Sequence, residues 1–244
     1  MPEIIIPGPE GRLEGRYSPS EDPQAPLALI LHPDPRYGGT MNNKVTYTLY
    51  HCFVKLGFVC LRFNFRGVGR SQGEYSKGEG ELSDAAVALD WLQNQNPNAR
   101  YCWIAGFSFG AWIAMQVLMR RPDLQAFVAI APPANLYDFS FLVPCPTSGL
   151  IVQGKEDKIV PAEVQGDLLN RLRNQRDITI KYEEIEGADH FFSNRMVDLH
   201  QIVSAYIQEQ SVIIGNKAKT PIRNLYDEGD DEIYENEDDD DDGF

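Results

Sequence analysis

Cysteine is scarce in this sequence, and its spacing argues against two kinds of protein. The four cysteines form no C-x-x-C pair and no metal-ligand spacing with histidine. The chain is therefore neither a disulfide-stapled scaffold nor a cysteine-based metal protein. Because each cysteine lies in an apolar or helical run, we expect buried, reduced thiols at Cys52, Cys60, Cys102 and Cys145.

Long apolar runs are also missing. The longest stretch without charged or strongly polar residues is about Trp103–Met115, which is too short to span a bilayer. The N-terminal residues Met1 to Ile4 lack the basic region followed by an apolar one that marks a signal peptide. We therefore expect a cytoplasmic protein with no membrane insertion.

Positive charge is absent from the last 18 residues, where twelve of the 36 acidic residues lie. The formal net charge is −14, so residues 1–226 carry only −2. Nothing in this nearly neutral body points to nucleic acid as a partner, and the acidic end would repel it. The apolar periodicity fails from residue 211, so we expect a single domain at 1–210 and a disordered tail at 211–244. Such a tail keeps the protein in solution or weakly docks a basic partner.

Strand and helix patterns alternate after residue 26. This alternation predicts an α/β protein with a mostly parallel twisted sheet and helices on both faces. The first 20 residues favour an antiparallel hairpin at the sheet edge. Apolar runs rich in branched residues predict strands at Leu27–His32, Phe58–Phe65, Tyr101–Phe107, Ala126–Ala131, Ser148–Gln153 and Ile178–Ile185. Apolar residues at helical spacing predict helices at Met41–Leu56, Ser83–Leu92, Gly110–Arg120, Ala162–Arg173 and Leu199–Ile207.

A G-x-S-x-G motif at Gly106–Gly110 falls between an expected strand and a strongly apolar helix. The motif alone is weak, but this context is where a nucleophile elbow must lie. The tight turn strains the serine backbone and brings strand and helix together, so the flanking glycines remove side chains that would collide. Ser108 would then project above the sheet, close to a helix N-terminus that helps to bind a developing anion. The alternative is a plain turn with a capping serine.

An acid and a base follow in the chain order that such a site requires. Asp157 lies after an expected strand, at the carboxyl edge of the sheet, and Glu156 is its rival. Among the four histidines, only His190 follows a strand near the C-terminus. We expect Ser108 to attack a carbonyl carbon, His190 to take and return the proton, and Asp157 to orient the imidazole. Alternatively, His190 is a structural loop residue and the carboxylates cap the next helix.

Residues 32–39, after the first buried strand, are the expected source of a second oxyanion-hole donor. The first donor is the N–H of Phe109, the residue after the nucleophile. Prolines on both sides of Asp34 have no N–H, so Asp34 offers the only amide between His32 and Arg36. We expect this amide to point into the site and the carboxylate to turn away, unless Asp34 only shapes the loop.

Five segments of the chain resemble a known family: His32–Asn43, Arg62–Gly73, Gly106–Gly110, Gly154–Asp157 and Asp189–Phe192. They look like bacterial α/β hydrolases related to dienelactone hydrolase. The resemblance covers about residues 3–210 and implies the α/β-hydrolase fold. Dienelactone hydrolases use a cysteine nucleophile where this chain has Ser108, which favours general ester or thioester chemistry.

No lid domain is expected, because only residues 132–147 separate the strand after the nucleophile helix from the strand that carries the acid. An open, apolar rim is expected from Pro132, Pro133, Tyr137, Phe139, Phe141 and Leu142. Arg66, Arg70 and Tyr137 are candidate substrate-binding residues, since guanidinium groups suit carboxylates and phosphates. For the two arginines we favour ion pairs with acidic neighbours at Glu74, Glu79 or Glu81.

The sequence therefore predicts a serine hydrolase that cleaves an ester, thioester or small amide of a small-molecule substrate through an acyl-enzyme. No cofactor or metal is expected. A short peptidase or an acyltransferase could use the same triad. A non-catalytic module that docks a partner through the acidic tail is disfavoured, because a binder needs no aligned acid and base.

Overall fold

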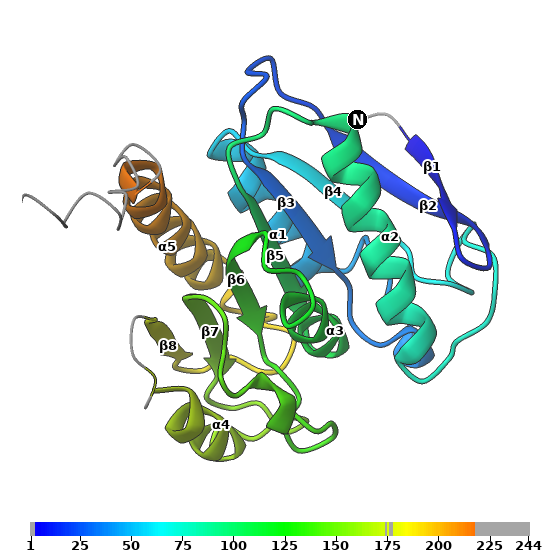
Figure 1. Cartoon of the computed structure of the whole chain (residues 1–244). Coiled ribbons are helices and arrows are strands. Elements are labelled where there is room, and N and C mark those ends of the chain that lie inside the picture. The colour runs from blue at the N-terminus through cyan, green and yellow to red at the C-terminus, as the bar shows by residue number, and fades with distance from the viewer. Residues whose placement is uncertain (1–2, 174, 176–177, 218–244) are drawn as a thin grey trace, which may run out of the picture.

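One eight-stranded sheet organises the protein, whose computed structural model describes residues 3–173, 175 and 178–217 (Figure 1). The strands are β1 (Glu3–Gly8), β2 (Gly11–Ser18), β3 (Leu27–Leu31), β4 (Val59–Phe63), β5 (Cys102–Phe107), β6 (Leu124–Ile130), β7 (Gly149–Gly154) and β8 (Ile180–Ile185). Their spatial order is β1-β2-β4-β3-β5-β6-β7-β8. Strands β3 to β8 pair in parallel, and β2 pairs antiparallel with both β1 and β4.

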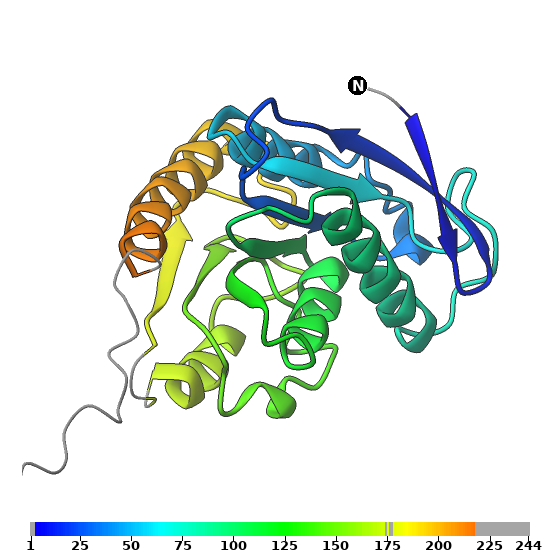
Figure 2. The ribbon, with the colours of Figure 1, turned by 45° about the horizontal axis from the view of Figure 1, so that its top comes forward.

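Helices cover both faces of this sheet, as the alternating pattern predicts (Figure 2). The α-helices are α1 (Lys44–Lys55), α2 (Glu79–Gln95), α3 (Phe109–Leu118), α4 (Val164–Arg173) and α5 (Met196–Lys217). Helices α1 and α5 share one apolar core with one face of the sheet, and α2, α3 and α4 share a second core with the opposite face. The α/β fold and the edge hairpin β1–β2 are confirmed.

Helix α5 is the largest departure from the expected elements. It continues through residues 211–217, whereas the sequence pattern ends the helix at Ile207 and the domain at residue 210. The remainder of the expected acidic tail, residues 218–244, lies outside the described residues. Its disorder and its docking role stay predictions.

The carboxyl ends of the parallel strands place the candidate residues together. Ser108 follows β5, Asp157 follows β7, His190 follows β8 and Asp34 follows β3. Between β6 and β7 the chain forms only loops and the short 3-10 helix η2 (Ser140–Leu142), so no lid covers this edge. The site is therefore built on the rigid end of the sheet and opens outward.

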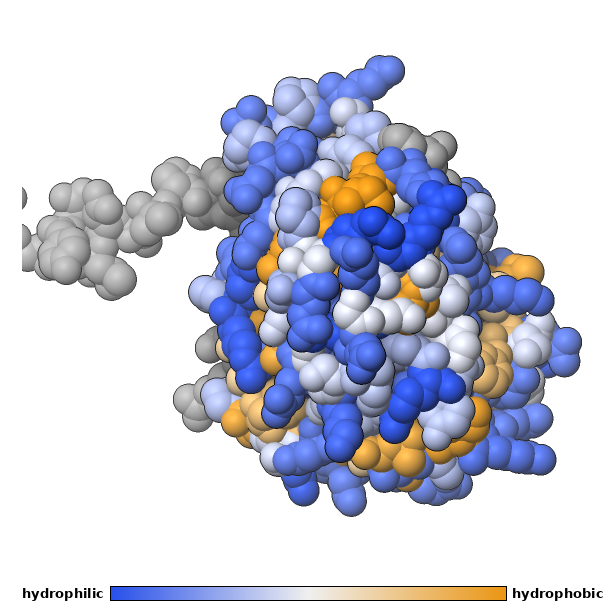
Figure 3. All heavy atoms as spheres, turned by 90° about the vertical axis from the view of Figure 1, so that its right-hand side faces the viewer, coloured by the Kyte–Doolittle hydropathy of each residue, from blue (hydrophilic) through white to orange (hydrophobic). Residues whose placement is uncertain are grey.

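The surface beside β1, β2 and α2 is mostly hydrophilic, with apolar side chains in separate patches (Figure 3). Within the described part of the chain, no helix is long and apolar enough to cross a membrane.

Candidate active site

Ser108 occupies a sharp turn between β5 and α3 and has backbone angles of φ 53° and ψ −120°. Positive φ is uncommon for a residue with a side chain and marks a strained position. The flanking glycines make the turn possible. A Cβ on Gly106 would lie 2.3 Å from the Gly110 carbonyl oxygen, and one on Gly110 would lie 2.5 Å from the Leu31 and His32 carbonyl oxygens. The expected nucleophile elbow is therefore present, and backbone atoms pack closely against both of its glycines.

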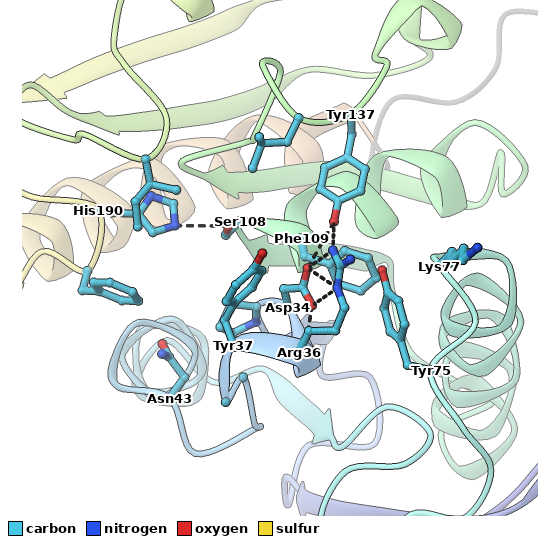
Figure 4. Close-up of a pocket in the computed structure, with 16 residues that line it drawn as sticks. Asp34, Arg36, Tyr37, Asn43, Tyr75, Lys77, Ser108, Phe109, Tyr137 and His190 are labelled. Carbon is cyan, nitrogen blue, oxygen red and sulfur yellow. Dashed lines mark hydrogen bonds and ion pairs between the residues drawn. The ribbon is translucent and has the colours of Figure 1, made fainter.

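The three candidate catalytic side chains form one hydrogen-bonded chain, of which Figure 4 shows the contact between His190 and Ser108. His190 Nε2 lies 3.2 Å from Ser108 Oγ. His190 Nδ1 lies 2.7 Å from Asp157 Oδ2, and both side chains are almost fully buried. Glu156, the rival acid, is exposed. The structure thus joins Ser108, His190 and Asp157 in the order that the sequence predicts.

A buried polar network holds Asp157, and sequence reasoning missed it. Asp157 Oδ1 accepts hydrogen bonds from the N–H groups of Ile159 and Val160. Its Oδ2 accepts a bond from Gln153 Nε2 at 3.0 Å, in addition to the one from His190. No motif marks Gln153, because it sits in an otherwise apolar strand and its partners come from loops. Asp157 consequently has one orientation, with Oδ2 facing the imidazole.

Packing and a local turn fix His190 from its other sides. The imidazole lies against Phe107, with ring centroids 5.0 Å apart. The neighbouring carboxylate, Asp189, accepts hydrogen bonds from the N–H groups of Phe191 and Ser193 and from the Ser193 hydroxyl. These bonds hold the pKa of Asp189 below its ordinary value. These hydrogen bonds within residues 189–193 therefore hold the loop that carries the imidazole.

His32 lies at the same sheet edge but has a structural role. Its Nε2 accepts a hydrogen bond from the Phe65 N–H, and its Nδ1 donates to the Pro33 carbonyl. These bonds require the neutral imidazole, because a protonated Nε2 could not accept. Complete burial lowers the pKa of His32 to about 4. The side chain thus ties the loop after β3 to the loop after β4.

Asp34 lies in the loop opposite Ser108, and Arg36 neutralises its carboxylate. Arg36 Nη2 lies 2.7 Å from Asp34 Oδ2, and the Tyr137 hydroxyl donates to the same oxygen at 3.2 Å. Burial and the Asp34 charge raise the pKa of Tyr137, which stays protonated. The Asp34 N–H has no acceptor among the described residues. Phe109 is the first residue of α3, so its N–H has no acceptor within the helix.

A cleft of about 980 Å³ surrounds Ser108 and His190. Aromatic and apolar side chains dominate its wall, together with the charged groups of Asp34, Arg36 and Lys77 (Figure 4). Sequence reasoning missed most of the wall, including Tyr37, Tyr75, Lys77, Leu136, Ile159 and Phe191. Leu136 lies in the loop after β6 and Ile159 in the loop after β7, both of which the sequence places at this edge. No sequence signal marked Tyr75 or Lys77.

The expected apolar rim is wrong except at Tyr137. Tyr137 lines the cleft and stacks on Trp112, with ring centroids 4.2 Å apart. Phe139 and Leu142 are buried in the core under α3, and Phe141 packs against the same cluster. The segment after β6 therefore contributes more to the core than to the rim.

Arg66 and Arg70, the candidate substrate-binding arginines, lie away from the cleft. Neither arginine lines the cleft. Arg66 is buried and bonds to Asp84 through Nε and Nη2, which raises the pKa of its guanidinium, and its Nη1 pairs with Glu10. Arg70 pairs with Glu3 on β1. Both arginines therefore form ion pairs, but with Asp84, Glu10 and Glu3 instead of the expected glutamates.

No cluster of three or more histidine, cysteine, aspartate or glutamate residues suited to a metal occurs in the described ranges. All four cysteines are free and buried, in line with the expected reduced thiols.

Comparison with known proteins places this geometry in a family. Residues 16–211 match the family model described as X-Pro dipeptidyl-peptidase (S15 family). An uncharacterised protein of Rickettsia prowazekii is 54% identical over 211 residues, which cover 85% of this chain and 89% of that protein.

Solved structures agree with this placement. A protein of unknown function from Agrobacterium tumefaciens has a TM-score of 0.85 and 53% identity, over 86% of this chain and 97% of that chain. A lidless α/β serine hydrolase from Xanthomonas campestris has a TM-score of 0.77 and 31% identity, over 86% and 94%. A dienelactone hydrolase from Anabaena variabilis, at 17% identity and a TM-score of 0.70, shares the fold. The chain belongs to the α/β-hydrolase superfamily of serine hydrolases, within the family that the S15 model describes.

Proposed function

We propose that the protein cleaves small esters or thioesters through an acyl-enzyme intermediate formed on Ser108. The observation that carries this proposal is the aligned chain from Ser108 through His190 to Asp157, on a strained elbow. A binding protein has no need to hold a serine in a costly backbone conformation beside an imidazole that a buried carboxylate orients.

The reaction follows from this geometry. Ser108 Oγ attacks the carbonyl carbon while His190 Nε2 takes its proton, and Asp157 stabilises the imidazolium through Nδ1–H. The N–H groups of Phe109 and Asp34 are the proposed donors to the oxyanion. His190 then protonates the leaving group. Water, activated by the same imidazole, releases the acid and restores Ser108.

The wall of the cleft favours an ester over an X-Pro peptide, the substrate class in the description of the matching family. A dipeptidyl-peptidase must bind the free α-ammonium group of its substrate, which calls for an unpaired carboxylate. Among the described residues that line the cleft, Asp34 is the only carboxylate, and Arg36 neutralises it. An incoming ammonium group would meet the cations of Arg36 and Lys77 instead. The resemblance of five sequence segments to dienelactone hydrolases also supports ester chemistry.

Fluorophosphonate labelling and a substrate panel test this proposal. Wild-type protein should be labelled at Ser108 and should turn over short para-nitrophenyl esters, and Ser108→Ala should lose both properties. The panel includes acyl thioesters and a dipeptidyl X-Pro anilide. Faster cleavage of the anilide than of every ester would contradict the ester assignment while leaving the triad intact.

We propose that this reaction takes place in the cytoplasm. Buried, unpaired cysteines support a reducing compartment, the cytoplasm, as the place of action. The expected partner is the small acyl substrate itself, and a weak basic partner for residues 218–244 stays a prediction.

A further inference from the structure

The wall of the cleft carries one positive charge in excess. Its charged residues other than His190 are Asp34, Arg36 and Lys77. Arg36 neutralises Asp34 through a short ion pair. Lys77 is exposed and has no ion pair within the described residues. A ligand in this cleft therefore meets an uncompensated cation, which favours an anionic group.

Arg36 is held as a rigid donor beside that cation. Its bonds to Asp34 and Tyr137 use Nε and Nη2. The guanidinium lies over the Tyr75 ring, 4.7 Å from the ring centroid. Its Nη1 has no acceptor among the described residues, and about half of the side chain (49%) is exposed. A planar guanidinium fixed in this way donates to a carboxylate with little loss of rotamer entropy.

Lys77 lies far from the reacting atoms and in an unusual backbone conformation. Figure 4 shows it beyond Tyr75, on the side of the cleft opposite His190. Its φ is 53°, in the left-handed region that a residue with a side chain adopts at a cost of about 1 kcal/mol or more. We name Arg36, Tyr75 and Lys77 the distal wall.

We propose that the distal wall binds a carboxylate carried by the substrate at the end remote from the scissile carbonyl. This inference rests on the proposed ester chemistry and narrows its substrate class to esters or thioesters of acidic molecules. A carboxylate fits better than a phosphate, because the excess of one positive charge matches a monoanion. The aromatic rings between Ser108 and Lys77 would contact the apolar part that joins the two ends.

Matched ester pairs test this subsite. The substrates are para-nitrophenyl monoesters of dicarboxylic acids of increasing chain length, each paired with its methyl-capped neutral counterpart. A second pair carries the acid on the alcohol side. Wild-type kcat/KM should favour the acidic member by roughly threefold to tenfold at the best chain length, and added salt should reduce this preference. The series that shows the preference identifies the side of the ester that carries the acid.

Reversal of the charge at Lys77 is the decisive test of the carboxylate subsite. Lys77→Glu should lower the ratio of acidic to neutral kcat/KM by about tenfold, because it replaces an attraction with a repulsion. Lys55→Glu is the matched control, since Lys55 is also exposed but lies at the end of α1, outside the cleft. An unchanged ratio in Lys77→Glu, or a wild-type preference for the capped esters, would overturn the subsite.

Binding without turnover separates this proposal from the proposed reaction. Phenylbutyrate should raise the Tm of the wild type more than the neutral phenylbutanol does, and Lys77→Glu should abolish the difference. If no ester is cleaved but this contrast holds, the reaction is wrong and the subsite stands. If esters are cleaved but the contrast is absent, the subsite is wrong and the reaction stands.

A second inference rests on the buried amides behind Asp157. Gln153 Nε2 donates to Asp157 Oδ2 and, at 2.7 Å, to the Val160 carbonyl. Gln153 Oε1 accepts a bond from Gln165 Nε2, which also donates to the Pro132 carbonyl at 2.7 Å. Because the carbonyl oxygens can only accept, each amide has one allowed orientation. Both glutamine side chains are fully buried.

The geometry points to Gln153 as a positioning residue that keeps Asp157 Oδ2 aimed at His190, with Gln165 holding Gln153 in turn. Gln153→Met should lower kcat by roughly tenfold to a hundredfold and leave KM within about twofold, because the ground-state contacts of the substrate are untouched. The rate of fluorophosphonate labelling should fall in parallel.

Gln116→Met is the control, because Gln116 is a partly buried amide on α3 that does not line the cleft. The pair Gln153→Met and Gln165→Leu should be non-additive in kcat, since the second amide acts through the first. A Gln153→Met protein with a lowered Tm but wild-type kcat when folded would make the network purely structural and overturn the inference.

Discussion

The two sides of the cleft are built in opposite ways. On one side, His190 and Asp157 are almost fully buried, and each polar atom that faces its neighbour is hydrogen-bonded. On the other side, Tyr37 is 85% exposed and Leu136 is 62% exposed. The first side is fixed by the sheet and by buried hydrogen bonds, whereas the second consists of loop side chains in contact with water.

This difference suggests a division of tasks, in which the buried side performs the reaction and the exposed side selects the substrate. Buried, bonded groups hold the reacting atoms within the narrow limits that proton transfer requires. Exposed loop residues contribute little to the free energy of unfolding, so they can change without loss of the fold. Changes on the first side should therefore alter kcat or stability, and changes on the second side should alter KM.

The largest effect is expected at the nucleophile. Ser108→Ala should lower kcat by about a million-fold, and His190→Ala by a similar factor, because the triad acts as a unit. Steady-state turnover of a para-nitrophenyl ester and fluorophosphonate labelling measure this effect. Turnover that survives in Ser108→Ala at more than a thousandth of the wild-type rate would break the assignment of the fixed side.

The nucleophile elbow should be equally intolerant of added volume. In Gly110→Ala the new methyl group would meet backbone carbonyl oxygens of Leu31 and His32 at 2.5 Å, and backbone cannot move aside as a side chain can. We expect the free energy of unfolding to fall by about 3 kcal/mol, measured by urea denaturation. In the control, Gly166→Ala on α4, the methyl group meets nothing within 4 Å and should leave stability unchanged or slightly higher.

The fixed side was also the side that the sequence predicted. Gly106, Gly110, Asp157 and His190 each belong to a local pattern, and chain order then joins the patterns. The distal wall has no such pattern, because Lys77 reaches the cleft only through the loop that precedes α2 and the packing of α2 on α3.

Burial accounts for the sequence predictions that were wrong. Arg66 lies in a segment of the active edge, but the partner that withdraws it from the cleft, Asp84, lies one helix further along. Phe139 was expected at the rim because it follows the right strand, yet it turns into the core. Such outcomes depend on packing between elements, which a pattern within one element does not contain.

Acid should destabilise the folded protein through His32. Its pKa in the folded protein is about 4, below the ordinary value of 6.5, so folding favours the neutral imidazole. This stabilisation is complete above pH 6.5 and is lost as the pH falls toward 4, because the unfolded chain takes up the proton first. The loss should be about 3 kcal/mol, measured as the free energy of unfolding in urea across this range. His32→Gln, which does not titrate, should lose about 3 kcal/mol less across the same range, and a loss equal to that of the wild type would refute the role of His32.

The smallest change in stability is expected at Tyr37, on the exposed side. Tyr37 ends the 3-10 helix η1 (Pro35–Tyr37) and lines the cleft, but most of its ring contacts water. Tyr37→Ala should therefore change the free energy of unfolding by no more than about 0.5 kcal/mol. We expect the ring to contact bound substrate equally in the ground state and the transition state, so its loss should raise KM for an aromatic ester about fivefold and leave kcat nearly constant. Tyr37→Phe keeps the ring and should keep the wild-type KM. A fall in kcat of more than tenfold in Tyr37→Ala would mean that the exposed side takes part in the chemical step, and the division between the two sides of the cleft would not hold.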